Sequence, residues 1–122
     1  MNGNVFTYGT LMFDSVWRSV AGRLGPHAPA RLYGYRRRGI SGVSYPGIVP
    51  GDAEEYVDGL LYLKVDGASL AAIDAFEDEG TEYRRIVVRV RLHGGGVCSA
   101  WAYEYLHPGN LEERGWDPSS RW

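Results

Sequence analysis

Apolar and polar residues alternate along two stretches in the second half of the chain. In residues 83–92 apolar side chains occupy one face of an extended strand and arginines occupy much of the other. In residues 97–106 three aromatic side chains share one face: Trp101, Tyr103 and Tyr105. A period of two is typical of half-buried β-strands. Gly94-Gly95-Gly96 separates the stretches, so a β-hairpin is predicted.

Shorter strands are predicted at residues 4–8, 30–35 and 57–65. Helical spacing is convincing at residues 68–76, where three apolar residues fall on one face: Leu70, Ile73 and Phe76. A second short helix is predicted from Asp14, as the capping residue, to about Ala21. Strands with one or two short helices predict an α+β fold that is mostly antiparallel or barrel-like.

Glycine and proline dominate two further segments. Residues 39–51 contain six of them and residues 107–122 contain four. Regular structure is therefore expected to be sparse in both, the first being a loop that can carry side chains into a site and the second an irregular C-terminal tail. Trp116 and Trp122 in this tail are expected to pack back on the fold or to meet a partner. The arginine run 36–38 is expected to be a solvated turn or edge.

Length and composition fit one domain over residues 1–122, with enough chain to bury a core. The net charge of −2 gives no reason to expect nucleic acid or an anionic membrane as a partner. The single cysteine, Cys98, suits a reducing compartment. Neither a signal-peptide pattern nor an apolar run near the ~20 residues of a membrane span is present, so a cytoplasmic location is expected.

The first predicted strand runs into Tyr8-Gly9-Thr10-Leu11. Gly9 allows a ligand to approach the main chain closely. The N–H groups of Gly9, Thr10 and Leu11 are then candidates for a small nest that binds an oxygen atom. An ordinary strand-ending turn is the alternative interpretation of the same residues.

Glu77 ends the helix-periodic run directly after Phe76. Apolar surroundings disfavour the charged form of a carboxyl and raise its pKa. Such a group can take up a proton and return it. The residues also fit a surface acid followed by further acids at Asp78, Glu79 and Glu82, and Glu79 is a second candidate for the catalytic role.

Metal chemistry has little support in the sequence. The three histidines lack zinc-type spacing, so no metal site is expected. His93 and the three glycines after it resemble a lipase oxyanion motif, but the chain has no matching nucleophile motif and the glycines suit a hairpin turn better.

Five short motifs follow one another along the chain: Tyr8-Gly9-Thr10-Leu11, Tyr45-Pro46-Gly47, Val57-Asp58-Gly59-Leu60-Leu61-Tyr62, Ile73-Asp74-Ala75-Phe76-Glu77 and Tyr83-Arg84-Arg85. In this order they resemble the γ-glutamylcyclotransferase-like family, which includes the γ-glutamylamine cyclotransferases and the plant AIG2-like proteins. The resemblance covers about residues 4–106. It implies a small β-barrel with packed helices and a pocket at one end.

The resemblance also implies an enzyme that cyclises a γ-glutamyl amide to 5-oxoproline and releases an amine without a cofactor. Glu77 matches the general acid/base of the family, although many relatives have glycine directly after this residue. The substrate-binding residues expected on this basis are Tyr8, Gly9, Thr10 and Leu11, and Tyr45 and Tyr83 are weaker candidates. The alternative is a non-catalytic small-molecule-binding or regulatory module. The leaving amine and the oligomeric state remain open.

Overall fold

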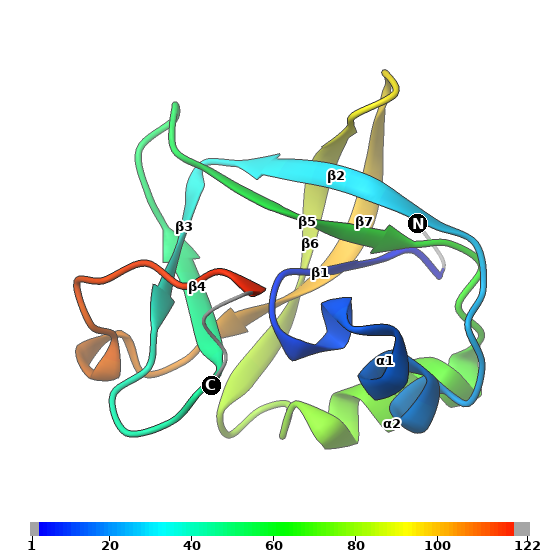
Figure 1. The fold of residues 1–122 in the computed structure, drawn as a ribbon, viewed down its shortest axis with the longest axis horizontal. Coiled ribbons are helices and arrows are strands. Elements are labelled where there is room, and N and C mark those ends of the chain that lie inside the picture. The colour runs from blue at the N-terminus through cyan, green and yellow to red at the C-terminus, as the bar shows by residue number, and fades with distance from the viewer. Residues whose placement is uncertain (1–2, 119–122) are drawn as a thin grey trace.

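The computed structural model describes residues 3–118, and its centre is a closed five-stranded β-barrel with two α-helices beside it (Figure 1). The barrel strands are hydrogen-bonded in the order β1-β5-β2-β6-β7, and the remaining two strands form a separate ribbon. The strands are β1 (Val5–Thr7), β2 (His27–Tyr33), β3 (Tyr35–Gly39), β4 (Pro46–Pro50), β5 (Tyr56–Tyr62), β6 (Tyr83–Leu92) and β7 (Val97–Tyr105). The prediction of an α+β, mostly antiparallel barrel is confirmed.

The predicted hairpin is β6 and β7, which pair antiparallel from Tyr83 opposite Tyr105 to Arg91 opposite Val97. The short strand β1 closes the barrel between β5 and β7. It runs antiparallel to β5 and parallel to β7, where Val5 lies opposite Trp101. Closure removes the open edges that would otherwise be free to pair with another chain.

Gly59 lies in β5 beside the end of its antiparallel neighbour β1. A Cβ atom at this position would lie 2.1 Å from the carbonyl oxygen of Thr7 and 2.8 Å from Cζ of Phe6. The two strands can approach this closely only because residue 59 has no side chain. The glycine therefore fixes the position of β1, and with it the turn that follows β1.

The two helices are α1 (Asp14–Ala21) and α2 (Gly67–Phe76), and they pack against each other beside the barrel (Figure 1). Asp66 caps α2, since its Oδ1 accepts the N–H of Ser69 at 2.7 Å. The prediction that Asp14 caps α1 was wrong. Phe13 is the N-cap, and Asp14 is the first helical residue, where its charge favours the helix N-terminus.

The expectation of sparse structure in residues 39–51 was partly wrong, because β4 lies there and pairs with β3 from Tyr35 opposite Pro50 to Gly39 opposite Pro46. Both prolines stand at the ends of β4, where a strand tolerates the missing N–H group. The arginine run, expected at a solvated turn or edge, lies within β3 and is only partly exposed.

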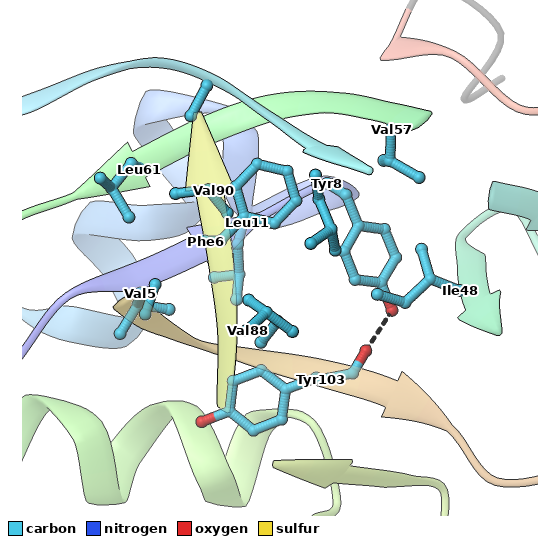
Figure 2. Packing of buried hydrophobic residues seen from close by; sticks show 14 of the residues in the cluster. Val5, Phe6, Tyr8, Leu11, Ile48, Val57, Leu61, Val88, Val90 and Tyr103 are labelled. Atoms are coloured by element: carbon cyan, nitrogen blue, oxygen red, sulfur yellow. Dashed lines mark hydrogen bonds between the residues drawn. The ribbon is translucent and has the colours of Figure 1, made fainter. Parts of the chain in front are cut away.

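The core fills the barrel interior (Figure 2). Fully buried side chains come from β1, β5 and β6, among them Val5, Phe6, Leu61 and Val90. Helix α1 joins this core through Trp17, whose ring stacks on Tyr62 with centroids 3.7 Å apart.

The C-terminal tail packs on the ribbon of β3 and β4. It contains a 3-10 turn (Pro108–Asn110), and Leu111 forms an isolated bridge with Ile40. Trp116 is buried, and its Nε1–H donates to the carbonyl of Ser44 at 2.8 Å. The tail is thus less irregular than expected, and Trp116 packs back on the fold. Trp122 lies outside the described residues. Within residues 3–118 neither helix is long and apolar enough to cross a membrane.

Candidate functional site

One cavity of about 230 Å³ brings together Glu77 and the six residues expected to bind substrate. They are Tyr8, Gly9, Thr10, Leu11, Tyr45, Glu77 and Tyr83. The other lining residues are Phe6, Thr7, Pro46, Phe76, Glu82 and Tyr103. The cavity therefore lies where the end of β1, the start of β4, the end of α2 and the start of β6 meet.

The turn after β1 contributes Gly9, Thr10 and Leu11 to the lining of this cavity. The chain leaves β1 at Thr7 and enters a 3-10 turn (Thr10–Met12) in which Gly9 accepts the N–H of Met12 at 3.0 Å. Within the described part of the chain, the N–H groups of Gly9, Thr10 and Leu11 have no acceptor. Free N–H groups that line a cavity can bind a carboxylate or carbonyl oxygen of a ligand.

Gly9 lies where the turn packs closely against β4. A Cβ atom here would lie 3.1 Å from Cδ and 3.2 Å from Cγ of Pro46. A side chain at residue 9 would therefore require Pro46 or the turn to shift by a few tenths of an ångström.

Glu77 is the C-cap residue of α2 and is partly buried. Among the described residues its carboxyl group has neither a hydrogen bond nor an ion pair, and no basic side chain lines the cavity. Burial, reinforced by the nearby charge of Glu82, raises the pKa of Glu77 to about 8. A carboxyl in this state can exchange a proton with a ligand near neutral pH.

Glu82 is a cavity residue that the sequence interpretation missed as part of the site. Its Oε1 accepts the hydroxyl of Tyr45 at 3.0 Å. Its position directly before Tyr83 in the fifth motif was the available signal. Glu79, the second candidate acid, does not line the cavity, and its Oε2 accepts the backbone N–H of Arg85 at 3.2 Å.

Besides Tyr45, three further tyrosines at the cavity have hydroxyls that bind other groups of the protein. Tyr8 donates to the carbonyl of Tyr103 at 2.7 Å (Figure 2), and Tyr83 donates to the carbonyl of Pro46 at 2.7 Å. Tyr103 itself donates to Oδ1 of Asp74 at 2.6 Å. Because these bonds fix the three side chains and occupy their hydroxyl groups, a ligand in the cavity would contact the aromatic rings and the backbone.

The Glu82→Gln substitution should lower the pKa of Glu77, because it removes the neighbouring negative charge that helps to keep the proton on Glu77. The pKa should stay above the ordinary carboxyl range, since burial is the larger cause and is unchanged. A ¹³C NMR titration of the Glu77 carboxyl measures this. Glu79→Gln is the matched control and should leave the titration unchanged; a pKa that moves equally in both variants would contradict the assignment.

Comparison with known proteins gives a consistent result. A family model described as "Gamma-glutamyl cyclotransferase, AIG2-like" matches residues 5–122. The chain is 36% identical over 87 residues to Protein AIG2 C of Arabidopsis thaliana, an alignment that covers 71% of this chain and 51% of the relative. It is 34% identical over 107 residues to the gamma-glutamylcyclotransferase family protein YtfP of Escherichia coli K12, covering 85% of this chain and 83% of that protein. The chain thus spans about half the length of the plant relative.

Solved structures share the fold. The solution structure of an Arabidopsis thaliana protein superposes with a TM-score of 0.79 at 28% identity, covering 92% of this chain and 76% of the other. The Arabidopsis protein therefore shares the overall fold of this chain.

Proposed function

Because the chain belongs to the family of AIG2-like γ-glutamyl cyclotransferases, we propose that it converts a γ-glutamyl amide into 5-oxoproline and a free amine. One observation carries the proposal: an unpaired carboxyl of raised pKa, Glu77, shares a cavity with the free N–H groups of Gly9, Thr10 and Leu11. A proton carrier and a set of donors for oxygen are what an acyl transfer at an amide needs.

The reaction balances without water and without a cofactor. The neutral α-amine of the substrate attacks the γ-carbonyl carbon, and its nitrogen gives one proton to the Glu77 carboxylate as the new C–N bond forms. A five-membered ring closes, and the carbonyl oxygen becomes an oxyanion. As the carbonyl re-forms, the bond to the amide nitrogen breaks, and Glu77 returns its proton to that nitrogen. The products are 5-oxoproline and the amine.

The backbone donors contribute in two ways. They hold the γ-glutamyl group folded back on itself, so that the two reacting atoms start close together and little entropy is lost in the transition state. They also donate to oxygen atoms of the substrate, including the one on which negative charge develops. Tyr8, Tyr45 and Tyr83 form the walls that confine the group.

The pKa of Glu77 suits this role. A pKa of about 8 is closer to the pKa values of amines than the pKa of an ordinary carboxyl group is. The free-energy difference for proton transfer between the substrate amine and Glu77 is then small. A small difference suits a group that must first accept a proton and then return it.

Mass spectrometry of the purified protein, incubated with a panel of γ-glutamyl amino acids and γ-glutamyl amines, tests the proposal. We expect 5-oxoproline together with the free amine for at least one member of the panel. The substrate that reacts fastest identifies the preferred leaving amine. Glutamate as the product would indicate hydrolysis instead. No product, with panel members still raising the melting temperature, would contradict the proposal in favour of a binding module.

A further inference from the structure

Arg37 reaches the back of the turn that carries the free N–H groups. It lies in β3 and is partly buried. Its Nη1 donates to two backbone carbonyl oxygens, that of Tyr8 at 2.8 Å and that of Asp58 at 3.0 Å. Arg37 does not line the Glu77 cavity; it lines a separate groove that also contains Trp116. It therefore approaches the turn from outside the cavity.

The Tyr8–Gly9 peptide connects this arginine to the cavity. The peptide is trans and planar, so its C=O and N–H groups point in opposite directions. The carbonyl of Tyr8 faces Arg37, and the N–H of Gly9 therefore points away from Arg37. Gly9 lines the cavity, and its N–H has no acceptor in the described residues. A partly buried cation and a free donor thus occupy the two ends of one peptide unit.

We propose that Arg37 is a positioning residue for catalysis, which fixes the Tyr8–Gly9 peptide and polarises it so that the N–H of Gly9 becomes a stronger donor to the substrate. This inference rests on the function proposed above. A hydrogen bond from a cation to a carbonyl is stronger than one between neutral groups. It draws electron density toward the oxygen, and hydrogen bonds in a chain polarise one another, so the N–H at the other end gains positive character.

The C-terminal tail holds Arg37 in this position. The guanidinium carbon lies 5.5 Å from the centroid of the Trp116 ring, within the range of a cation–π contact. The tail also pairs with the end of β3, because Gly39 donates to the carbonyl of Arg114 at 3.2 Å and accepts the N–H of Glu112 at 2.8 Å. Burial lowers the pKa of Arg37 and the charges of Asp58 and Asp117 oppose this, but an arginine stays charged.

Two substitutions of Arg37 distinguish a role in positioning and polarising the Tyr8–Gly9 peptide from a role in packing alone. Arg37→Met keeps an apolar stem and removes the charge and the donors, and Arg37→Lys keeps the charge with a different geometry. Arg38→Met is the matched control, since Arg38 is the next residue of the same strand and, within residues 3–118, donates a hydrogen bond only to the carbonyl of Arg37. Each variant is assayed for kcat and KM with the best γ-glutamyl amide, with and without added guanidinium, and the ¹⁵N shift of Gly9 is recorded by NMR.

We expect Arg37→Met to lower kcat/KM by about tenfold to a hundredfold, less than removal of a whole oxyanion donor. Arg37→Lys should fall between this variant and the wild type. Guanidinium, at concentrations well below those that denature proteins, should restore part of the activity of Arg37→Met. The Gly9 ¹⁵N shift should move in Arg37→Met and stay in place in Arg38→Met.

Wild-type kcat/KM and an unmoved Gly9 shift in Arg37→Met would overturn the inference, as would a loss that guanidinium does not restore. If Arg37→Met does not fold, Arg37→Lys carries the same test, and a Lys variant identical to the wild type in both measurements would overturn it. Failure of the proposed function itself is recognised separately, because the wild type would then form no 5-oxoproline. In that case the Gly9 shift alone decides whether Arg37 polarises the peptide.

Discussion

Replacing Glu77 by glutamine should lower the formation of 5-oxoproline by about 10²- to 10⁴-fold, the usual contribution of a general acid/base. Glutamine has nearly the same shape as the protonated carboxyl, so the cavity and the backbone donors keep their places, but the side chain cannot carry the proton. The initial rate of 5-oxoproline formation by both proteins measures this, with circular dichroism to verify the fold. A Glu77→Gln variant as active as the wild type would exclude Glu77 as the acid/base.

The same substitution should change the pH dependence of stability. The pKa of Glu77 is raised from an ordinary value of 4.5 to about 8 on folding, so the unfolded chain loses this proton at lower pH than the folded protein. Wild-type stability should therefore fall as the pH rises from about 4.5 to 8, relative to Glu77→Gln. The two proteins should melt at similar temperatures at pH 4, and the variant should melt higher at pH 9. Glu79→Gln, which changes an exposed acid, should show no such difference from the wild type.

Replacing Gly59 by alanine should lower the free energy of unfolding by about 3 kcal/mol. The new methyl group would lie 2.1 Å from the carbonyl oxygen of Thr7, so β1 or β5 must move. The contact is with backbone, which cannot turn aside as a flexible side chain can. Because Thr7 leads directly into the Tyr8–Leu11 turn, we also expect activity to fall in the fraction of protein that still folds.

Gly67→Ala is the matched control for this experiment. Gly67 is the first residue of α2, and a Cβ atom there would have no neighbour within 4 Å. Alanine favours the helix and restricts the unfolded chain, so this variant should be as stable as the wild type or slightly more stable. Urea denaturation gives the free energy of unfolding for both variants. Equal stability of the Gly59 and Gly67 variants would contradict the close approach of β1 and β5.

The sequence predicted the β6–β7 hairpin and helix α2, because the signals for both lie within short, continuous stretches of the chain. The β6–β7 hairpin was predictable because the alternation of apolar and polar residues and the glycine turn all fall within about twenty residues. Helix α2 was predictable from the spacing of its apolar residues. The β3–β4 ribbon was missed because its arginines and prolines are poor strand signals, and its stability comes from pairing across a loop and from the tail that covers it.

The site was predicted residue by residue, but its surroundings were not. Glu77 and the six expected substrate-binding residues do share one cavity. The place of Glu82 in the cavity was missed, because beyond its position next to Tyr83 it depends on how the chain turns after α2, where Asp78 and Gly80 adopt positive φ angles of 54° and 92°. Arg37 was expected to face solvent. Its hydrogen bonds to Tyr8 and Asp58 come from segments 29 and 21 residues away, so no local pattern reveals them.

Isotope labelling tests the central claim, that the γ-glutamyl group closes on its own amine, most directly. The purified protein is incubated with its best γ-glutamyl amide in ¹⁸O-labelled water, and the masses of the products are measured by mass spectrometry. Internal cyclisation consumes no water, so the account predicts 5-oxoproline without ¹⁸O and an equal amount of free amine. Glutamate carrying one ¹⁸O atom would show that water, rather than the substrate's own amine, attacks the carbonyl, and would contradict the account.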